Sequence, residues 1–363
     1  MPVVKLGDVA IEVRETYKGD KTGYPIVGLE HISPGEVVLS NWSVNTKNTF
    51  SKIFRQGDIL FGRRRAYLKK AAIAPFDGIC SGDITVIRAK SDKLYPELLP
   101  FVIQNDDFFD YAVEKSAGSL SPRVKWEHLK NYTFKLPSLE KQKDLAELFW
   151  SINDSRNAYQ KLLQETDELI KSQFIEWFDG PLSDRIFKTE SLKKNAVLLN
   201  GRAYRQNELL KKGKYRVLRV GNFFSNDSWY YSDLELEEDK YCDNGDLLYA
   251  WSATFGPKIW DGGKVIYHYH IWKVCVGEAY DKYFLCKLLE YASEQFGNQT
   301  HGTTMLHLTK AGIESTRFVV PPLDVQKQFS AFVRQSDKSK FELRQAIDDV
   351  NHLIKSLVQQ ELK

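Results

Sequence analysis

The segment Leu136-Pro-Ser-Leu-Glu-Lys-Gln-Lys143 returns 184 residues later as Val320-Pro-Pro-Leu-Asp-Val-Gln-Lys327. At the same offset, Leu169-Ile-Lys-Ser172 recurs as Leu353-Ile-Lys-Ser356. Self-similarity at a fixed offset is the signature of a duplicated structural unit. The chain is therefore expected to contain two copies of one unit.

The duplication extends towards the start of each copy. Gly57-Asp-Ile-Leu60 pairs with Gly245-Asp-Leu-Leu248, and Tyr24-Pro-Ile-Val27 pairs with Tyr215-Arg-Val-Leu218. The offset drifts by a few residues here, as insertions in surface loops would cause. The order along the chain is head, helix, head, helix.

Length and composition fit two folded domains. The chain has 363 residues, of which 42% are hydrophobic and 27% charged, as in an ordinary globular protein. Its four cysteines form no CxxC pair, which favours reduced core residues. No apolar run approaches the roughly 20 residues that span a bilayer. We therefore expect a cytoplasmic protein without a membrane partner.

Each copy ends in a segment with the apolar spacing of a long helix. Pro137 and Pro321-Pro322 mark the two helix starts, and Asp179-Gly-Pro181 ends the first helix. Each helix would have about 40 residues and a length of roughly 60 Å. A heptad stripe on each would pair the helices, through Leu145, Leu148, Ile152, Leu162, Leu169, Phe329, Phe332, Leu343, Val350, Leu353 and Leu357.

The helix that leaves the second head can cover the first helix only by running back along it. The sequence thus predicts an α+β chain with two similar strand-rich domains, separated by two long antiparallel helices that form a coiled-coil-like spacer with approximate two-fold symmetry. The predicted boundaries are 1–137 for the first head, 138–180 for the central helix, 181–320 for the second head and 321–363 for the C-terminal helix. A plain tandem duplication is the simpler interpretation, and a molecular ruler is the functional one.

The heads show short alternating segments separated by turn residues, which is typical of strands. The predicted strands include Ala71–Ala74, Ile84–Arg88, Tyr215–Val220 and Tyr267–Val276. Helices are predicted over Pro96–Glu114 in the first head and Asp281–Phe296 in the second.

Cationic and aromatic residues gather in the predicted loops, although the net charge of the whole chain is only +3. The stretch Arg185–Arg219 carries eleven Lys or Arg against two Glu, a local balance of +9. Arginine forks suit phosphates and guanine edges, whereas a charge run in isolation is more often a solvated face. The candidate DNA contacts are Arg63, Arg64, Arg65, Tyr67, Lys69, Lys70, Ser119, Ser121, Arg123, Arg202, Tyr204, Arg205, Trp251, Thr254, His301, Thr303 and Thr304.

Motifs of catalysis are missing from the sequence. There is no P-loop, no glycine fingerprint for a methyl-donor cofactor and no Asn-Pro-Pro-aromatic motif of amino-methyltransferases. His268 and His270 would share one face of a strand, but no acidic or thiol partner lies at metal-ligand spacing. We therefore expect a binding protein with no catalytic residue, no metal and no cofactor of its own.

The order of these motifs resembles that of Type I restriction–modification specificity subunits over essentially the whole chain. The resemblance rests on Gly57-Asp58, Gly118-Ser119 and Pro137 with Gln142, and on the second-half partners Gly245-Asp246, Gly302-Thr303 and Pro322 with Gln326. It implies two target recognition domains, each reading half of a bipartite, asymmetric site in double-stranded DNA, for anti-phage defence. It also implies that the helices dock two methyltransferase subunits and that restriction (motor) subunits join the complex. S-adenosylmethionine, ATP and Mg²⁺ would belong to these partners, which would flip and methylate the target adenine and cut the DNA.

Two rival hypotheses come from other functional classes. The apolar helix stripe would also suit a non-catalytic coiled-coil scaffold that binds protein partners. The histidine-bearing loops are the one hint of an autonomous nuclease. Sequence-selective DNA binding by the assembled complex would distinguish a DNA specificity subunit from a protein-binding scaffold. Incubation of the isolated chain with DNA, Mg²⁺ and methyl donor would test the nuclease hypothesis.

Overall fold

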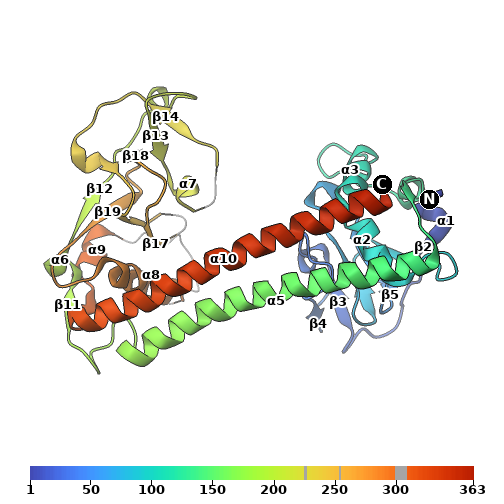
Figure 1. The fold of residues 1–363 in the computed structure, drawn as a ribbon, viewed down its shortest axis with the longest axis horizontal. Coiled ribbons are helices and arrows are strands. Elements are labelled where there is room, and N and C mark those ends of the chain that lie inside the picture. The colour runs from blue at the N-terminus through green and yellow to red at the C-terminus, as the bar shows by residue number, and fades with distance from the viewer. Residues whose placement is uncertain (225–226, 253–254, 299–308) are drawn as a thin grey trace. The chain divides into compact units, whose positions relative to one another are not determined.

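The computed structural model describes residues 1–224, 227–252, 255–298 and 309–363 of the chain. Contacts divide it into two compact units, unit 1 (Met1–Leu162 with Leu343–Lys363) and unit 2 (Leu163–Glu342). Both units contain a strand-rich head and parts of two long helices, α5 (Leu139–Phe178) and α10 (Leu323–Leu362) (Figure 1). The predicted α+β class with two strand-rich domains and two long helices is confirmed.

Unit 1 contains three small sheets. The first pairs β1 (Val3–Lys5) with β10 (Thr133–Lys135). The second has the order β2 (Ala10–Val13), β9 (Ile84–Ala89), β6 (Ile59–Gly62), β7 (Ala71–Ile73). The third has the order β4 (Ser43–Val44), β3 (Pro25–Val27), β8 (Gly78–Cys80), β5 (Lys52–Phe54).

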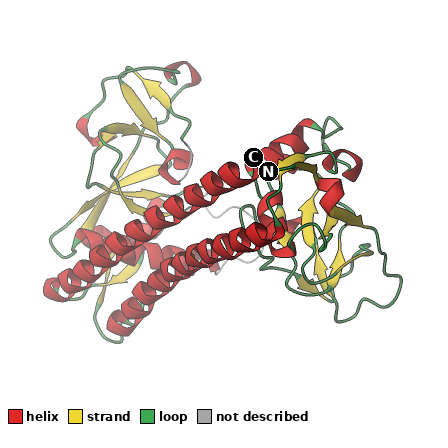
Figure 2. Cartoon of the chain, turned by 45° about the vertical axis from the view of Figure 1, so that its right-hand side comes forward, coloured by secondary structure: helices red, strands yellow, loops and turns green. Residues whose placement is uncertain are grey.

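Unit 2 repeats this topology strand for strand. Figure 2 draws the strands of both heads in yellow. Its first sheet pairs β11 (Thr189–Ser191) with β20 (Arg317–Val319). Its second has the order β12 (Ala196–Asn200), β19 (Ile271–Val276), β16 (Leu247–Ala250), β17 (Gly256–Ile259). Its third has the order β14 (Tyr230–Ser232), β13 (Tyr215–Leu218), β18 (Val265–Tyr267), β15 (Tyr241–Cys242). In both units the third strand of the unit runs parallel to its eighth strand, so the sequence repeat is a repeat of topology.

Short helices complete the heads. Unit 1 contains the α-helices α1 (Leu6–Val9), α2 (Leu99–Ile103), α3 (Asp106–Glu114) and α4 (Trp126–Leu129), with the 3₁₀ turns η1 (Leu29–His31), η2 (Ala66–Leu68) and η3 (Pro96–Leu98). Unit 2 contains α6 (Leu192–Asn195), α7 (Val220–Phe224), α8 (Lys282–Asn298) and α9 (Lys310–Ser315), with η4 (Gln206–Glu208) and η5 (Glu238–Lys240).

Two predicted elements are interrupted. The helix expected over Pro96–Glu114 breaks at Gln104, whose amide nitrogen donates to the carbonyls of Glu36 (2.7 Å) and Ala71 (2.6 Å), and Asn105 then caps α3. The strand expected over Tyr267–Val276 turns at residues 268–270, where the amide of Ile271 donates back to His268 at 2.9 Å. Hydrogen bonds specific to this fold override the local apolar pattern in both places.

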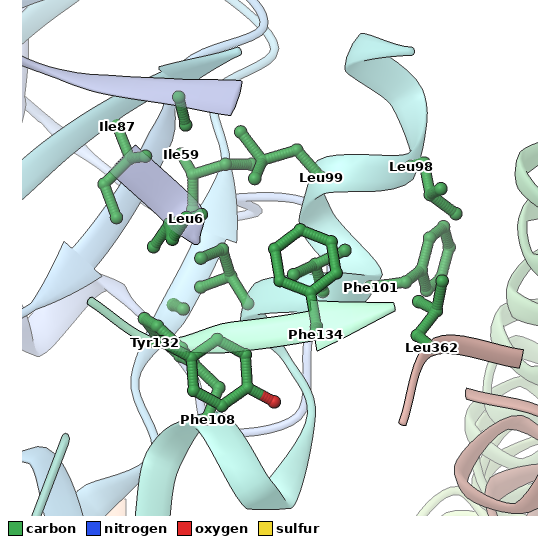
Figure 3. Close-up of a cluster of buried hydrophobic side chains, with 14 of the residues drawn as sticks. Leu6, Ile59, Ile87, Leu98, Leu99, Phe101, Phe108, Tyr132, Phe134 and Leu362 are labelled. Atoms are coloured by element: carbon green, nitrogen blue, oxygen red, sulfur yellow. The ribbon is translucent and has the colours of Figure 1, made fainter. Parts of the chain in front are cut away.

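The core of unit 1 lies between its sheets, α2 and α3, and the end of α10. Phe108 packs edge-on against Tyr132, with ring centroids 5.1 Å apart. Leu362, near the end of α10, belongs to the same buried cluster and lies beside Phe101 (Figure 3). This part of α10 is therefore attached to the first head.

The core of unit 2 is rich in aromatic rings. Phe174 and Phe178 of α5 lie 5.5 Å and 5.4 Å from the ring of Phe329 on α10, and Phe178 lies 5.0 Å from Phe284 on α8. Ring pairs in this distance range contribute beyond their buried area.

The long helices run antiparallel inside each unit. In unit 1, Lys141 near the start of α5 lies 3.9 Å from Glu361 near the end of α10. In unit 2, Asp167 of α5 contacts Lys340 of α10. Phe174, which is later in α5, contacts Phe329, which is earlier in α10.

The predicted pairing stripe is partly wrong. Leu145 and Phe329 are buried, and Ile152, Phe332, Leu343, Val350 and Leu357 are half-buried. Four leucines of the stripe have 44% to 50% of their surface exposed: Leu148, Leu162, Leu169 and Leu353. The residue after each of the four, at 149, 163, 170 and 354, is buried or half-buried instead. Each helix must face both a head and the other helix. At these four positions the buried face of the helix therefore lies one residue later than the predicted stripe.

Candidate nucleic-acid interface

The Gly-Asp motifs form matching turns rather than a binding site. Gly57 and Gly245 have φ values of +86° and +88°, a backbone conformation that glycine adopts without strain. Asp58 is buried and accepts two bonds from Arg88, at 2.6 and 2.8 Å. Asp246 lies 2.7 Å from Lys273. Both aspartates thus fasten the turn to the neighbouring strand of the same sheet.

The glutamines near the helix starts form matching clasps. Gln142 is buried, accepts from the amide of Tyr95 at 2.8 Å and donates to Pro137 at 2.9 Å. Gln326 accepts from the amide of Asp281 at 2.8 Å and donates to Pro321 at 2.7 Å. These side chains fix each head to its long helix, so this motif too belongs to the scaffold.

Two predicted basic segments of unit 1 come together in the fold. Arg64 donates to the hydroxyl of Ser121 at 2.7 Å, and Arg123 donates to Asp83 at 2.8 Å. Arg64 also lies 3.3 Å from Asp83. Burial alone would raise the pKa of Asp83, but its bonds with Arg123 and Arg64 outweigh burial and lower the pKa. The result is a cationic cluster on three loops, made of Arg64, Asp83, Ser121 and Arg123.

Other candidates of the same loops lie apart from this cluster. Arg65 is exposed, and its amide donates to Pro122 at 2.8 Å. Tyr67 and Ser119 are also exposed. Lys69 pairs with Asp106 at 2.6 Å, and Lys70 donates to the carbonyl of Leu29 at 2.6 Å. The structure thus brings Arg64, Ser121 and Arg123 together and holds the two lysines elsewhere.

Sequence reasoning missed a cationic hollow beside this cluster. A cavity of about 380 Å³ is lined by Arg63 together with Arg14, Lys52 and Lys125, and by two acids that pair with Arg14, Glu12 and Glu127. Lys52 donates to the carbonyl of Ile84 at 2.6 Å, and burial lowers its pKa. These cations come from three distant segments, so no local sequence pattern could have grouped them with Arg63.

In unit 2 the predicted basic segment is held by an internal ion pair. Arg202 binds Glu208 through two bonds of 2.9 and 2.8 Å, and this pairing lowers the pKa of Glu208 to about 2. The guanidinium also lies 5.2 Å from the ring centroid of Tyr204, whose pKa is raised by burial. Arg205 is exposed. Of the three candidates, Arg205 is thus the cation most accessible to a ligand.

A second hollow, of about 360 Å³, lies in unit 2. Its lining includes Arg219, Tyr230, His268 and His270. The Arg219 guanidinium lies 5.3 Å from the ring of Tyr230. Burial, His270 and Arg219 lower the pKa of His268 to about 4. Because residues 268–270 form a turn, the expectation that both histidines alternate on a strand is wrong.

Trp251 lies at the end of β16 against aromatic neighbours. Its ring is stacked 5.6 Å from Trp272 and packed edge-on 5.0 Å from His270, and its indole donates to the carbonyl of Tyr269 at 2.8 Å. Four other candidates of unit 2 lie outside the described residues: Thr254, His301, Thr303 and Thr304.

Two features are absent from residues 1–224, 227–252, 255–298 and 309–363, the part of the chain that the structure describes. They contain no helix that is both long and apolar enough to cross a membrane. They contain no group of three or more His, Cys, Asp or Glu placed to hold a metal ion.

Comparison with known proteins identifies the family. The family described as "Type I restriction modification DNA specificity domain" matches residues 1–166 and 191–350. A Methanocaldococcus jannaschii protein, named putative type I restriction enzyme MjaX specificity subunit, is 20% identical over 367 residues, covering 88% of this chain and 81% of that protein.

Two solved structures share the fold. One is a chain from work on complex assembly and conformational transition of the type I R-M system, with 19% identity, a TM-score of 0.60 and coverage of 99% of this chain and 97% of that chain. The other is the S subunit of a Type I restriction–modification system from M. genitalium, with 9% identity, a TM-score of 0.58 and coverage of 100% and 96%. With the family matching both halves, and with the resemblance of the motifs confirmed, this chain belongs to the Type I restriction–modification DNA specificity subunits.

Proposed function

We propose that each head is a target recognition domain that contacts one half of a bipartite, asymmetric DNA site. The domains would be residues 1–137 and 181–320, with 138–180 and 321–363 as the helical spacer between them. One observation carries the asymmetry. Arg63 follows β6, and its backbone amide donates to the carbonyl of Asp83. Trp251 follows β16, and its backbone amide donates to the carbonyl of His270. Equivalent backbone sites thus present a guanidinium in one head and an indole in the other.

The chain would bind DNA without making or breaking bonds. Two methyltransferase subunits and restriction subunits would supply S-adenosylmethionine, ATP and Mg²⁺, consistent with the missing catalytic motifs. The cationic cluster of unit 1 suits phosphate oxygens and guanine edges.

The exposed leucines of α5 would dock a methyltransferase subunit. Leu148 and Leu162, both in unit 1, are two heptads apart and share one helix face. Exposed apolar side chains that repeat on one face are typical of a protein interface. Leu162→Glu in the full chain should reduce recovery of the methyltransferase subunit, and Lys161→Glu on a neighbouring face serves as the matched control.

The salt dependence of DNA binding by the assembled complex tests the cationic cluster. Each phosphate contact contributes about 0.9 to the slope of log affinity against log salt. We expect Arg64→Ala with Arg123→Ala to flatten this slope by up to about 2. Lys69→Ala, from the same loop but paired with Asp106, is the control and should leave it unchanged. An unchanged slope in the double variant would remove this cluster from the interface.

Methylome mapping of cells that carry the chain with its partners tests the bipartite reading. The expected result is two different half-sites separated by a fixed gap. A complex that binds specific and scrambled DNA equally well would favour the protein-binding scaffold instead.

A further inference from the structure

The two long helices bury one cation each at equivalent points of the repeat. Arg156 on α5 and Lys340 on α10 are separated by the repeat offset of 184 residues. Their exposed fractions are 8% and 6%. A buried charge is costly unless it is paired, so the partners of these two cations can be compared directly.

Lys340 in unit 2 has two carboxylate partners. Its ammonium nitrogen lies 2.8 Å from Asp167 on α5 and 2.7 Å from Asp337 on its own helix. The charge of Lys340 is therefore compensated within the chain.

Arg156 in unit 1 lacks both of these carboxylates. The repeat places Asn153 where unit 2 has Asp337, and Asn351 where unit 2 has Asp167. The guanidinium donates instead to neutral oxygens of Gly35 (2.8 Å), Asn153 (2.8 Å) and Asn157 (3.3 Å). These bonds use three of its five N–H groups. The ε-nitrogen of Arg156 and the amide nitrogen of Asn153 are buried without a partner among the described residues.

A cavity of about 400 Å³ lies beside this arginine, inside unit 1. Of the two acids in its wall, Asp106 is paired with Lys69 at 2.6 Å and with Lys355 at 3.0 Å. Glu36 accepts from Ser40 at 2.6 Å, and it acts on Arg156 as a nearby charge. The wall also contains Lys355, the partner of Asp106. Its other residues are apolar or neutral and include Phe101, Ile354, Val358, Gln160, Asn351 and Gln359.

We propose that this cavity of unit 1 binds a carboxylate group that takes the place of the two aspartates missing around Arg156. A guanidinium offers two parallel N–H groups to a carboxylate. The apolar wall suits the hydrocarbon stem of such a group, as in a glutamate side chain or a free amino dicarboxylate. Small rotation of the side chain would turn the unused N–H groups of Arg156 towards the cavity.

The first arm of the test uses free acid on the purified full chain. Sodium glutamate should raise the midpoint of thermal unfolding more than sodium chloride at equal ionic strength. Arg156→Gln should remove this difference, because the neutral amide cannot form the bidentate ion pair that a guanidinium forms with a carboxylate.

The second arm supplies the carboxylate within the chain. Asn351→Asp recreates the partner that Asp167 provides in unit 2, and it should raise the unfolding midpoint by about 2–4 °C and abolish the specific response to glutamate. Asn351→Gln keeps the amide and is the matched control, for which no increase is expected. In unit 2, Asp167→Asn with Asp337→Asn should instead lower the midpoint, because it leaves Lys340 uncompensated.

The third arm separates a free acid from an acidic side chain of a bound protein. If wild type ignores free glutamate but Asn351→Asp weakens assembly with the methyltransferase subunit relative to Asn351→Gln, the carboxylate belongs to that subunit. If free glutamate acts through Arg156, the ligand is a small acid. The proposal is overturned if neither response occurs, or if Asn351→Asp is no more stable than Asn351→Gln.

Discussion

The Gly-Asp turns of the two units share a backbone but differ in how the aspartate is held. Asp58 has 1% of its side chain exposed and binds the arginine fork of Arg88 through both oxygens. Asp246 has 26% exposed and meets the single ammonium of Lys273. The strand order is kept while the side-chain chemistry changes. The duplicated part of this protein is therefore its topology, and the energy that stabilises each copy is distributed differently.

Removing these carboxylates should produce the largest difference between the units. Asp58→Asn leaves Arg88 without its buried partner, and we expect a loss of about 3 kcal/mol from unit 1. Asp246→Asn should cost about 1 kcal/mol, because both of its charges are partly solvated. Native-state hydrogen exchange, read separately on β6 and β16, measures each loss. Equal losses would show that the two turns are energetically equivalent despite their different geometry.

The glutamine clasps should behave alike in both units. Gln142→Leu and Gln326→Leu each leave a buried backbone amide and a proline carbonyl without partners. A cost of about 2 kcal/mol is expected for each variant. The measurement is the denaturant midpoint of the full chain, with Gln160→Leu on an exposed position of α5 as the control. A large effect at one clasp alone would contradict their equivalence.

Histidine chemistry distinguishes unit 2. His268 has a pKa of about 4 in the folded chain, whereas an unfolded histidine titrates near 6.5. Between these values the unfolded state binds more protons, so stability falls as the pH falls from about 6.5 to about 4. The loss is at most about 1.4 kcal/mol per pH unit, and less because the ring is partly exposed.

Thermal unfolding between pH 7 and pH 5 checks this dependence. His268→Asn should flatten the dependence in unit 2, and His128→Asn, at an exposed position of unit 1, is the control. A slope that His268→Asn leaves intact would assign it to other groups.

The scaffold followed from the sequence because the repeat offset compared the chain with itself. The helix starts, the Gly-Asp turns and most strands were located by residues that recur, and the structure shows that these residues make backbone contacts. Long-range bonds could not be anticipated in this way. Gln104 is drawn to the carbonyls of Glu36 and Ala71, and neither partner is visible in the local pattern around residues 96–114.

The candidate site was less accessible to sequence reasoning. Counting cations grouped Lys69 and Lys70 with their arginine neighbours, although Asp106 and Leu29 hold them elsewhere. It omitted Arg14 and Lys52, which reach Arg63 only through the sheet pairing of unit 1. The heptad register predicted the burial of Leu145 and Phe329 but not the exposure of Leu148, Leu162, Leu169 and Leu353, because a stripe shared between a head and a helix has no single partner surface.

The smallest predicted effect concerns the acid within the cationic cluster. Asp83 pairs with both Arg64 and Arg123, whereas the equivalent site of unit 2 carries His270 beside Trp251. Asp83→Asn keeps the side-chain shape but removes one negative charge next to the proposed phosphate contacts. The slope of log DNA affinity against log salt should therefore steepen by up to about 1, with little change in stability because this pair is partly exposed. His270→Asn, at the equivalent site of unit 2, is the comparison and should leave the slope unchanged. If Asp83→Asn also leaves the salt slope unchanged, Arg64 and Arg123 do not face phosphates. The two heads then differ only in the side-chain bonds that hold their turns.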